Sequence, residues 1–157
     1  MKTFISLFAL FLSLSLTAQT NTATWYLNDT SGNGIQSSSN TASGNYSTAM
    51  GDSTTASGQY STAMGYQTEA SGNNSTAMGR GTIASGNDST ALGANTEASG
   101  NNSTAIGENT EASGIISTAL GFGTVASGIV STAMGYSTEA SGHYSTSMGI
   151  NLSLIHI

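Results

Sequence analysis

The side chains able to do chemistry are few and widely spaced, and they form no recognisable catalytic pattern. The chain has 157 residues, no Cys and two His, so thiolate metal sites and cysteine nucleophiles are excluded. Neither His143 nor His156 stands in a Ser-His-Asp pattern, and no Gly-x-Ser-x-Gly or His-Glu-x-x-His motif occurs. Asp is too sparse for a calcium-binding β-roll, which repeats Gly-Gly-x-Gly-x-Asp. We therefore expect no enzyme activity, no cofactor and no metal site.

The charge balance excludes one class of partner. Eight Asp and Glu outnumber the two basic residues, Lys2 and Arg80, which gives a formal net charge of −6 at pH 7. Such a chain repels a phosphate backbone, so no nucleic-acid partner is expected. Only 6% of the residues are charged, 20 are Gly and none is Pro, which is typical of a repeat protein rather than of an enzyme.

Residues 1–18 have the three parts of a secretory signal peptide. Lys2 provides the positive start, Phe4 to Leu16 is an almost wholly apolar run, and Thr17-Ala18-Gln19 ends it with small and polar residues. The run is shorter than the roughly 20 residues that span a bilayer, and a retained N-terminal anchor is the alternative. We expect cleavage after Ala18 and export of an acidic chain.

A repeat organises the rest of the chain. The motif Ala-Ser-Gly begins at Ala42 and returns every 14 residues until Ala140, and a second block, Ser-Thr-Ala-Met-Gly in residues 47–51, follows at the same period. Together they define eight repeats over residues 42–151. Each repeat divides into two halves, because Ala49 follows Ala42 by seven positions. Self-similarity at a fixed period is the signature of a repeat architecture.

The repeat predicts an all-β fold. Sixteen of the 20 Gly fall at fixed repeat positions, and each would cost a helix about 1 kcal/mol relative to Ala. Short alternating runs closed by Gly and by polar corners are typical of strands joined by tight turns. Stacked at a fixed period, they predict a parallel β-solenoid, or β-roll, with two short strands per 14-residue coil.

Alternation along the strand separates two columns of side chains. Ala49 and its equivalents, as far as Ala133, are small enough to fill so thin a coil. The next residue then points outward, and this column is apolar in every repeat: Met50, Met64, Met78, Leu92, Ile106, Leu120, Met134 and Met148. We expect it to form an interface with further copies of the chain, since burial gains about 1.5 to 3 kcal/mol per side chain. The alternative places Met inside and Ala outside, which weakens the argument for assembly.

The corners vary while the strands do not. In the sixth and seventh repeats, the polar residues usual near the corners give way to an apolar and aromatic set: Ile115, Ile116, Phe122, Val125, Ile129, Val130 and Tyr136. An exposed patch of this kind often marks a contact surface. Two interpretations stay open: an adhesive site for host matrix, another cell or another fibre, and a packing surface between neighbouring chains.

The pattern Ala-x-Gly-x-x-Ser-x-Ala-Met/Ile/Leu-Gly at period 14 resembles the head repeats of YadA-type trimeric autotransporter adhesins, also called haemagglutinin-like head repeats. The resemblance covers residues 42–151 in consecutive copies. It implies a left-handed parallel β-roll, a homotrimer, and a place on the surface of a Gram-negative bacterium. An adhesin of this family also carries a neck, a stalk and a C-terminal membrane anchor. None is found here, so we expect a truncated fragment, with any membrane contact made through the missing anchor.

The segments on either side of the repeats follow no pattern. We expect residues 19–41 to be an irregular N-terminal cap or linker, with Trp25 as its anchor, and disorder up to about residue 35 is the alternative. The repeat register fails after Asn151, and residues 152–157 are interpreted as a non-native or truncated tail. A short genuine capping tail is the alternative.

The function expected from these observations is adhesion rather than catalysis. An exported rod would attach to host extracellular matrix or to other cells through many weak contacts. The first rival is a structural spacer or shaft of a surface or phage-tail-like fibre, whose C-terminal chaperone or sorting domain is missing. The second is an ice-binding solenoid, which the alternation of Thr48 with Met50 disfavours because it interrupts a Thr-x-Thr face.

Overall fold

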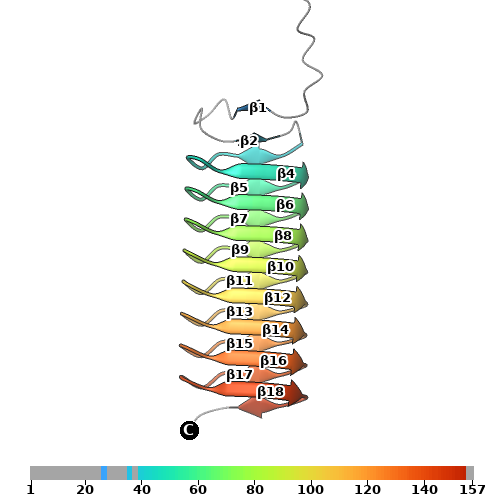
Figure 1. Ribbon diagram of the computed structural model, residues 1–157, viewed down its shortest axis with the longest axis vertical. Coiled ribbons are helices and arrows are strands. Elements are labelled where there is room, and N and C mark those ends of the chain that lie inside the picture. Colours follow the sequence, from blue (N-terminus) through green and yellow to red (C-terminus); the bar gives the residue numbers. More distant parts are fainter. Residues whose placement is uncertain (1–25, 28–34, 37–38, 155–157) are drawn as a thin grey trace, which may run out of the picture.

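In the computed structural model, which describes residues 26–27, 35–36 and 39–154, the chain is a straight stack of flat coils. Figure 1 shows long and short strands alternating along a single axis. Each coil contributes one long strand of five residues and one short strand of two residues. The chain therefore folds as the parallel β-solenoid of 14-residue coils that the repeat predicts.

The long strands form most of a 10-stranded sheet. Each long strand from β4 to β16 pairs in parallel with the strand 14 residues further on, so that Ala49 lies beside Ala63 and Met50 beside Met64. These strands are β4 (Thr48–Asp52), β6 (Thr62–Tyr66), β8 (Thr76–Arg80), β10 (Thr90–Ala94), β12 (Thr104–Glu108), β14 (Thr118–Phe122), β16 (Thr132–Tyr136) and β18 (Thr146–Ile150).

The short strands form a nine-stranded sheet on the other side of the coil. They also pair in parallel at the repeat spacing, as Glu97 with Glu111 shows. They are β3 (Thr41–Ala42), β5 (Thr55–Ala56), β7 (Glu69–Ala70), β9 (Ile83–Ala84), β11 (Glu97–Ala98), β13 (Glu111–Ala112), β15 (Val125–Ala126), β17 (Glu139–Ala140) and β19 (Ser153–Leu154).

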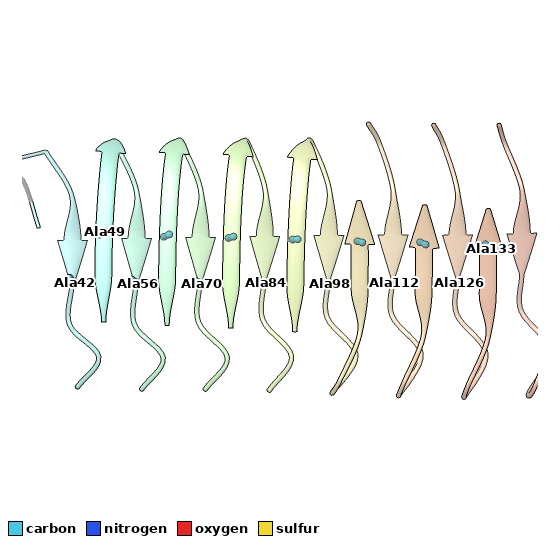
Figure 2. Close-up of a cluster of buried hydrophobic side chains, with 14 of the residues drawn as sticks. Ala42, Ala49, Ala56, Ala70, Ala84, Ala98, Ala112, Ala126 and Ala133 are labelled. Atoms are coloured by element: carbon cyan, nitrogen blue, oxygen red, sulfur yellow. The ribbon is translucent and has the colours of Figure 1, made fainter. Parts of the chain in front are cut away.

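The interior of the roll is filled by small side chains from both sheets. Its apolar part consists of alanines at 0% exposure, contributed by long and short strands in turn. Figure 2 shows them on the facing strands, from Ala42 to Ala133. Buried hydroxyl residues accompany them, Ser47 and its equivalents before the long strands and Thr54 and its equivalents before the short ones. The prediction that the Ala column lies inside is confirmed, and the inverse arrangement with Met inside is wrong.

Two columns of Gly allow the coils to stack closely. A Cβ placed on Gly51, whose φ is 131°, would lie 1.9 Å from the carbonyl oxygen of Gly65 in the next coil. A Cβ on Gly44 would lie 2.0 Å from the carbonyl oxygen of Gly58. No side chain fits at such separations, so the fixed Gly positions follow from the backbone contact between successive coils.

The first coil begins slightly earlier than the repeat pattern suggests. Asn40 stands 14 residues before Thr54 and takes the same buried position, at 6% exposure. Its side-chain amide donates to the Gly51 carbonyl and its carbonyl accepts from the Thr54 N–H, both at 3.0 Å. Above it, β1 (Tyr26–Leu27) pairs antiparallel with β2 (Ile35–Gln36), and β2 pairs with β4. Trp25 and the predicted signal peptide lie outside the described residues.

The backbone of residues 152–154 continues the stack. Strand β19 pairs with β17 in the repeat register, and the Glu139 N–H donates to the Leu152 carbonyl at 2.7 Å. The expectation that register fails after Asn151 is therefore wrong for the backbone of these residues. Only the side chains depart from the pattern, since Leu152 takes a Thr position, Leu154 takes an Ala position, and both are 47% exposed. The described part of the chain contains no helix long and apolar enough to cross a membrane.

Candidate interaction surfaces

The predicted interface residues lie together on the outer face of the 10-stranded sheet. We call them the apolar ladder: Met50, Met64, Met78, Leu92, Ile106, Leu120, Met134 and Met148. Each follows a buried residue of the long strand, and the parallel register places each one beside its equivalents in the adjacent coils. Met78, Ile106 and Met148 are 38%, 37% and 59% exposed, and the other members are partly exposed. The ladder thus presents an unbroken apolar stripe along the rod.

The other broad face is polar and partly acidic. Position 69 and its equivalents point outward from the short strands, and they run in the order Glu69, Ile83, Glu97, Glu111, Val125 and Glu139. Glu97 and Glu111 are adjacent, where like charges repel mildly. Such a column discourages lateral sticking, so the two broad faces differ in the kind of surface that each can bind.

The structure separates the predicted corner patch into distinct groups. Ile115, Ile116, Ile129 and Val130 lie in the turns before the long strands, which we call the first edge. Phe122 and Tyr136 end the long strands at the second edge, on the opposite side of the rod (Figure 1). Val125 belongs to the short strand β15. The separation arises because a five-residue strand, about 17 Å long, runs from one edge to the other.

Along much of the first edge, a backbone N–H of one coil donates a hydrogen bond to a side chain of the next coil. The backbone N–H of Gln59 donates to Asn73 Oδ1 at 3.1 Å, that of Asn73 to Asn87 Oδ1 at 3.1 Å, and that of Asn87 to Asn101 Oδ1 at 3.0 Å. His143 continues this edge ladder, since its Nδ1 accepts from the Ile129 N–H at 3.1 Å. The sequence excluded His143 from a Ser-His-Asp pattern but did not reveal this role. The available signal was the repeat column itself, in which His143 stands three 14-residue repeats after Asn101.

The apolar residues of the first edge are unfavourable choices for the coil itself. Ile115 and Ile129 carry no acceptor, so they remove two positions from the edge ladder, each hydrogen bond contributing about 0.5 to 1.5 kcal/mol. Ile116 and Val130 have φ of 58° and 54°. This left-handed conformation suits Asn, which stands there in other coils, and strains a β-branched residue by about 1 to 3 kcal/mol. Some other contact must offset these costs.

Aromatic side chains stack between adjacent coils on both edges. The rings of Tyr46 and Tyr60 on the first edge are 5.2 Å apart with planes 5° from parallel. Those of Phe122 and Tyr136 on the second edge are 5.0 Å apart and 7° from parallel. The parallel register, which puts equivalent positions about 4.8 Å apart, produces both stacks. Sequence analysis missed the Tyr46–Tyr60 pair, although its spacing of 14 residues was visible.

Among the described residues, no group of three or more His, Cys, Asp or Glu side chains could hold a metal ion. What the fold presents is an apolar stripe, an acidic column and two edges with aromatic and aliphatic residues. These features are typical of a structural solenoid protein that exposes repeated side chains along its faces and edges.

Comparison with known families identifies the repeat. The family model described as the YadA head domain repeat, which spans two copies, matches residues 42–68, 56–82, 70–96, 98–124, 112–138 and 126–151. The chain belongs to the YadA head repeat family. Members of this family are adhesin-like heads of surface-exposed autotransporters in Gram-negative bacteria. No curated protein matches the chain.

Proposed function

We propose that this chain forms a homotrimeric adhesin head, a rod that is exported to the cell surface and attaches it to extracellular matrix or to other cells. The observation that supports the proposal best is the position of the apolar ladder. The interior is already full, since its alanines are at 0% exposure, so the Met, Leu and Ile side chains have no place inside the chain.

Burial of the ladder supplies a large driving force for assembly. Eight side chains of this kind contribute roughly 12 to 24 kcal/mol per chain, taken as an upper bound from about 1.5 to 3 kcal/mol each. A parallel bundle around a closed symmetry axis buries the ladder of every chain and leaves the acidic sheets in water. Three chains per bundle is the number that membership of the family supports.

The outer surfaces of the trimer then carry the adhesion. Repetition along the coils and around the axis offers each weak contact many times, and linked weak contacts raise the overall affinity without a deep pocket. The acidic column keeps these rods apart from one another in solution. Attachment of this kind is expected to disappear when the trimer dissociates, even if every exposed side chain is retained.

A matched pair of substitutions tests the trimer. Ile106 in the ladder and Ile83 on the acidic sheet are both 37% exposed in the isolated chain, so burial alone does not distinguish them. We expect Ile106→Glu to convert the trimer to monomers in sedimentation, because three carboxylates would be buried around one axis. Ile83→Glu should leave the mass unchanged, since Glu69 and Glu97 already occupy that column.

Adhesion is measured with the same variants. Beads coated with the unaltered chain should bind matrix proteins or bacterial cells, beads with Ile83→Glu should bind equally, and beads with Ile106→Glu should lose binding. A well-folded monomer at micromolar concentration for the unaltered chain would contradict the proposal. A trimer that binds neither surface would instead support the spacer of a fibre.

A further inference from the structure

The two edges of the rod match each other coil by coil. Where the first edge is apolar, the second edge of the same coil is apolar or aromatic as well: Ile116 with Phe122, Val130 with Tyr136, and Tyr144 with Ile150. All six side chains are exposed in the isolated chain, from 38% for Val130 to 79% for Tyr144. The apolar edge residues towards the C-terminal end are therefore present on both sides of the rod at the same level.

Coils with a polar residue on the first edge also have a polar or charged residue on the second edge in two cases. Asn74 shares its coil with Arg80, and Asn102 shares its coil with Glu108. Near the N-terminal end, Tyr60 shares its coil with Tyr66. The first and fourth coils depart from the rule, since Tyr46 is accompanied by Asp52 and Asp88 by Ala94.

Contacts within one chain do not explain the match. The paired positions lie at opposite ends of a five-residue strand, about 17 Å apart. The apolar residues of the first edge are also unfavourable for the hydrogen bonds and the backbone conformation of their own coil. Ile115 and Ile129 lack the acceptor that Asn provides in the edge ladder, and Ile116 and Val130 have a left-handed backbone. The apolar residues at these positions are therefore explained by contacts outside the coil.

We propose that the first edge of each chain packs against the second edge of the next chain, coil against equal coil, around the trimer. The inference rests on the proposed trimer and specifies its contacts. In a closed ring about one axis, neighbouring chains are related by rotation without axial shift, so each first edge meets a second edge at the same height. Ile116 and Val130 of one chain then cover Phe122 and Tyr136 of its neighbour.

Opposite charges on the two edges lie within one coil of each other in this alignment. Asp88 is the acidic residue of the first edge, and Asn74 Nδ2 donates to its Oδ1 at 3.1 Å. Arg80, the basic residue of the second edge, ends the long strand in the coil of Asn74. Equal-level pairing places Arg80 of one chain beside Asn74 of its neighbour, with Asp88 one coil, about 4.8 Å, further along the rod. The match assigns the apolar corners to contacts between copies, and not to an outward-facing receptor site.

Cysteine cross-linking tests the edge pairing, because the chain has no Cys of its own. The probe is the double variant Ile116→Cys with Phe122→Cys, oxidised at low protein concentration and separated on a non-reducing gel. A disulfide requires Cα atoms within about 7 Å, which the strand between the two positions prevents inside one chain. We expect a covalently closed trimer as the main product, with a yield independent of protein concentration.

Three controls define the geometry. Each single variant should give no covalent product, and an equal mixture of the two single variants, refolded together, should give covalent dimers and nothing larger. The double variant Ile116→Cys with Arg80→Cys, whose positions lie three coils or about 14 Å apart in height, should also give no covalent trimer. Cross-linking of Ile116→Cys to itself would overturn the proposed pairing.

Sedimentation of the reduced Ile116→Cys/Phe122→Cys variant separates the two proposals. A trimer that yields no covalent trimer on oxidation overturns the edge pairing and leaves the adhesin head standing, with the apolar corners turned outward. A monomer, for this variant and for the unaltered chain alike, overturns both.

Discussion

Individual residues inside the roll are held to a narrow range of size but not to a fixed polarity. Alanines at 0% exposure alternate with buried Ser and Thr. Ser47 Oγ donates to the Gly44 carbonyl at 2.7 Å and Ser145 Oγ to the Gly142 carbonyl at 2.6 Å. The hydroxyl oxygens of the Ser residues between these two, from Ser61 to Ser131, and of the buried Thr54 column, such as Thr82 Oγ1, have no hydrogen-bond partner in the described structure. Volume therefore limits this interior more strongly than hydrogen bonding does.

Substitutions at Thr82 test whether volume matters more than hydrogen bonding in the interior. Thr82→Val replaces an unpaired buried hydroxyl by a methyl group of similar size, so we expect the free energy of unfolding to rise by about 1 kcal/mol. Thr82→Ala should lower it by about 1 kcal/mol, because a methyl group is lost from a packed interior. Urea denaturation of both variants measures the difference. A clear loss of stability in the Val variant would show that the hydroxyl has a partner after all.

At the scale of strands, the Gly columns control how closely one coil approaches the next. A Cβ on Gly93, whose φ is 132°, would lie 1.8 Å from the carbonyl oxygen of Gly107, and backbone atoms at that distance cannot give way without breaking the ladder. A glycine at the corner that follows a long strand, in contrast, has room for a side chain. Gly81 has φ of 62°, and a Cβ there would meet only the side chain of Asn95, at 2.9 Å.

These two glycines make a matched experiment. Gly93→Ala should destabilise the rod by more than about 3 kcal/mol, through steric overlap and a strained φ. Gly81→Asn should leave the thermal midpoint within a few degrees, since Asn95 and Asn109 occupy the same corner position with similar φ. Differential scanning calorimetry distinguishes the outcomes. Equal effects at both sites would contradict the close contact between coils.

The strands, the coil length and the buried Ala column could be predicted from the sequence because each rests on local periodicity. The half-repeat also held the signal for the buried Thr column, since Thr54 follows Ser47 as Ala56 follows Ala49, by seven positions. The separation of the corner residues could not be found in the same way. Ile116 and Phe122 are close in sequence, but the extended strand between them places them on opposite edges.

For the whole molecule, the edge residues connect the stability of one chain to that of its neighbours. Ile115→Asn with Ile129→Asn would restore acceptors to the edge ladder within each chain, a gain of about 0.5 to 1.5 kcal/mol for each hydrogen bond. The same change removes two Ile side chains from the proposed contact between chains, where burial contributes about 1.5 to 3 kcal/mol each. We therefore expect the trimer to melt several degrees lower.

His143→Asn provides the control for this measurement, because it exchanges one acceptor of the edge ladder for another and should leave the melting temperature unchanged. An unchanged or higher melting temperature for the Ile115→Asn/Ile129→Asn variant would mean that these corners face water in the trimer. The edge pairing would then be wrong, while the burial of the apolar ladder would be unaffected.

The constant 14-residue register has a consequence for chains of unequal length. Gain or loss of one whole repeat in the middle of the rod changes its reach by about 4.8 Å and preserves every coil-to-coil bond. Three identical chains keep their edges aligned after such a change. When a long and a short chain assemble together, the coils beyond the altered one are shifted by one repeat. Ile and Phe side chains of one chain would then face Asn and Glu side chains of the other. Variants that differ by one repeat should therefore sort into separate trimers when expressed in the same cell.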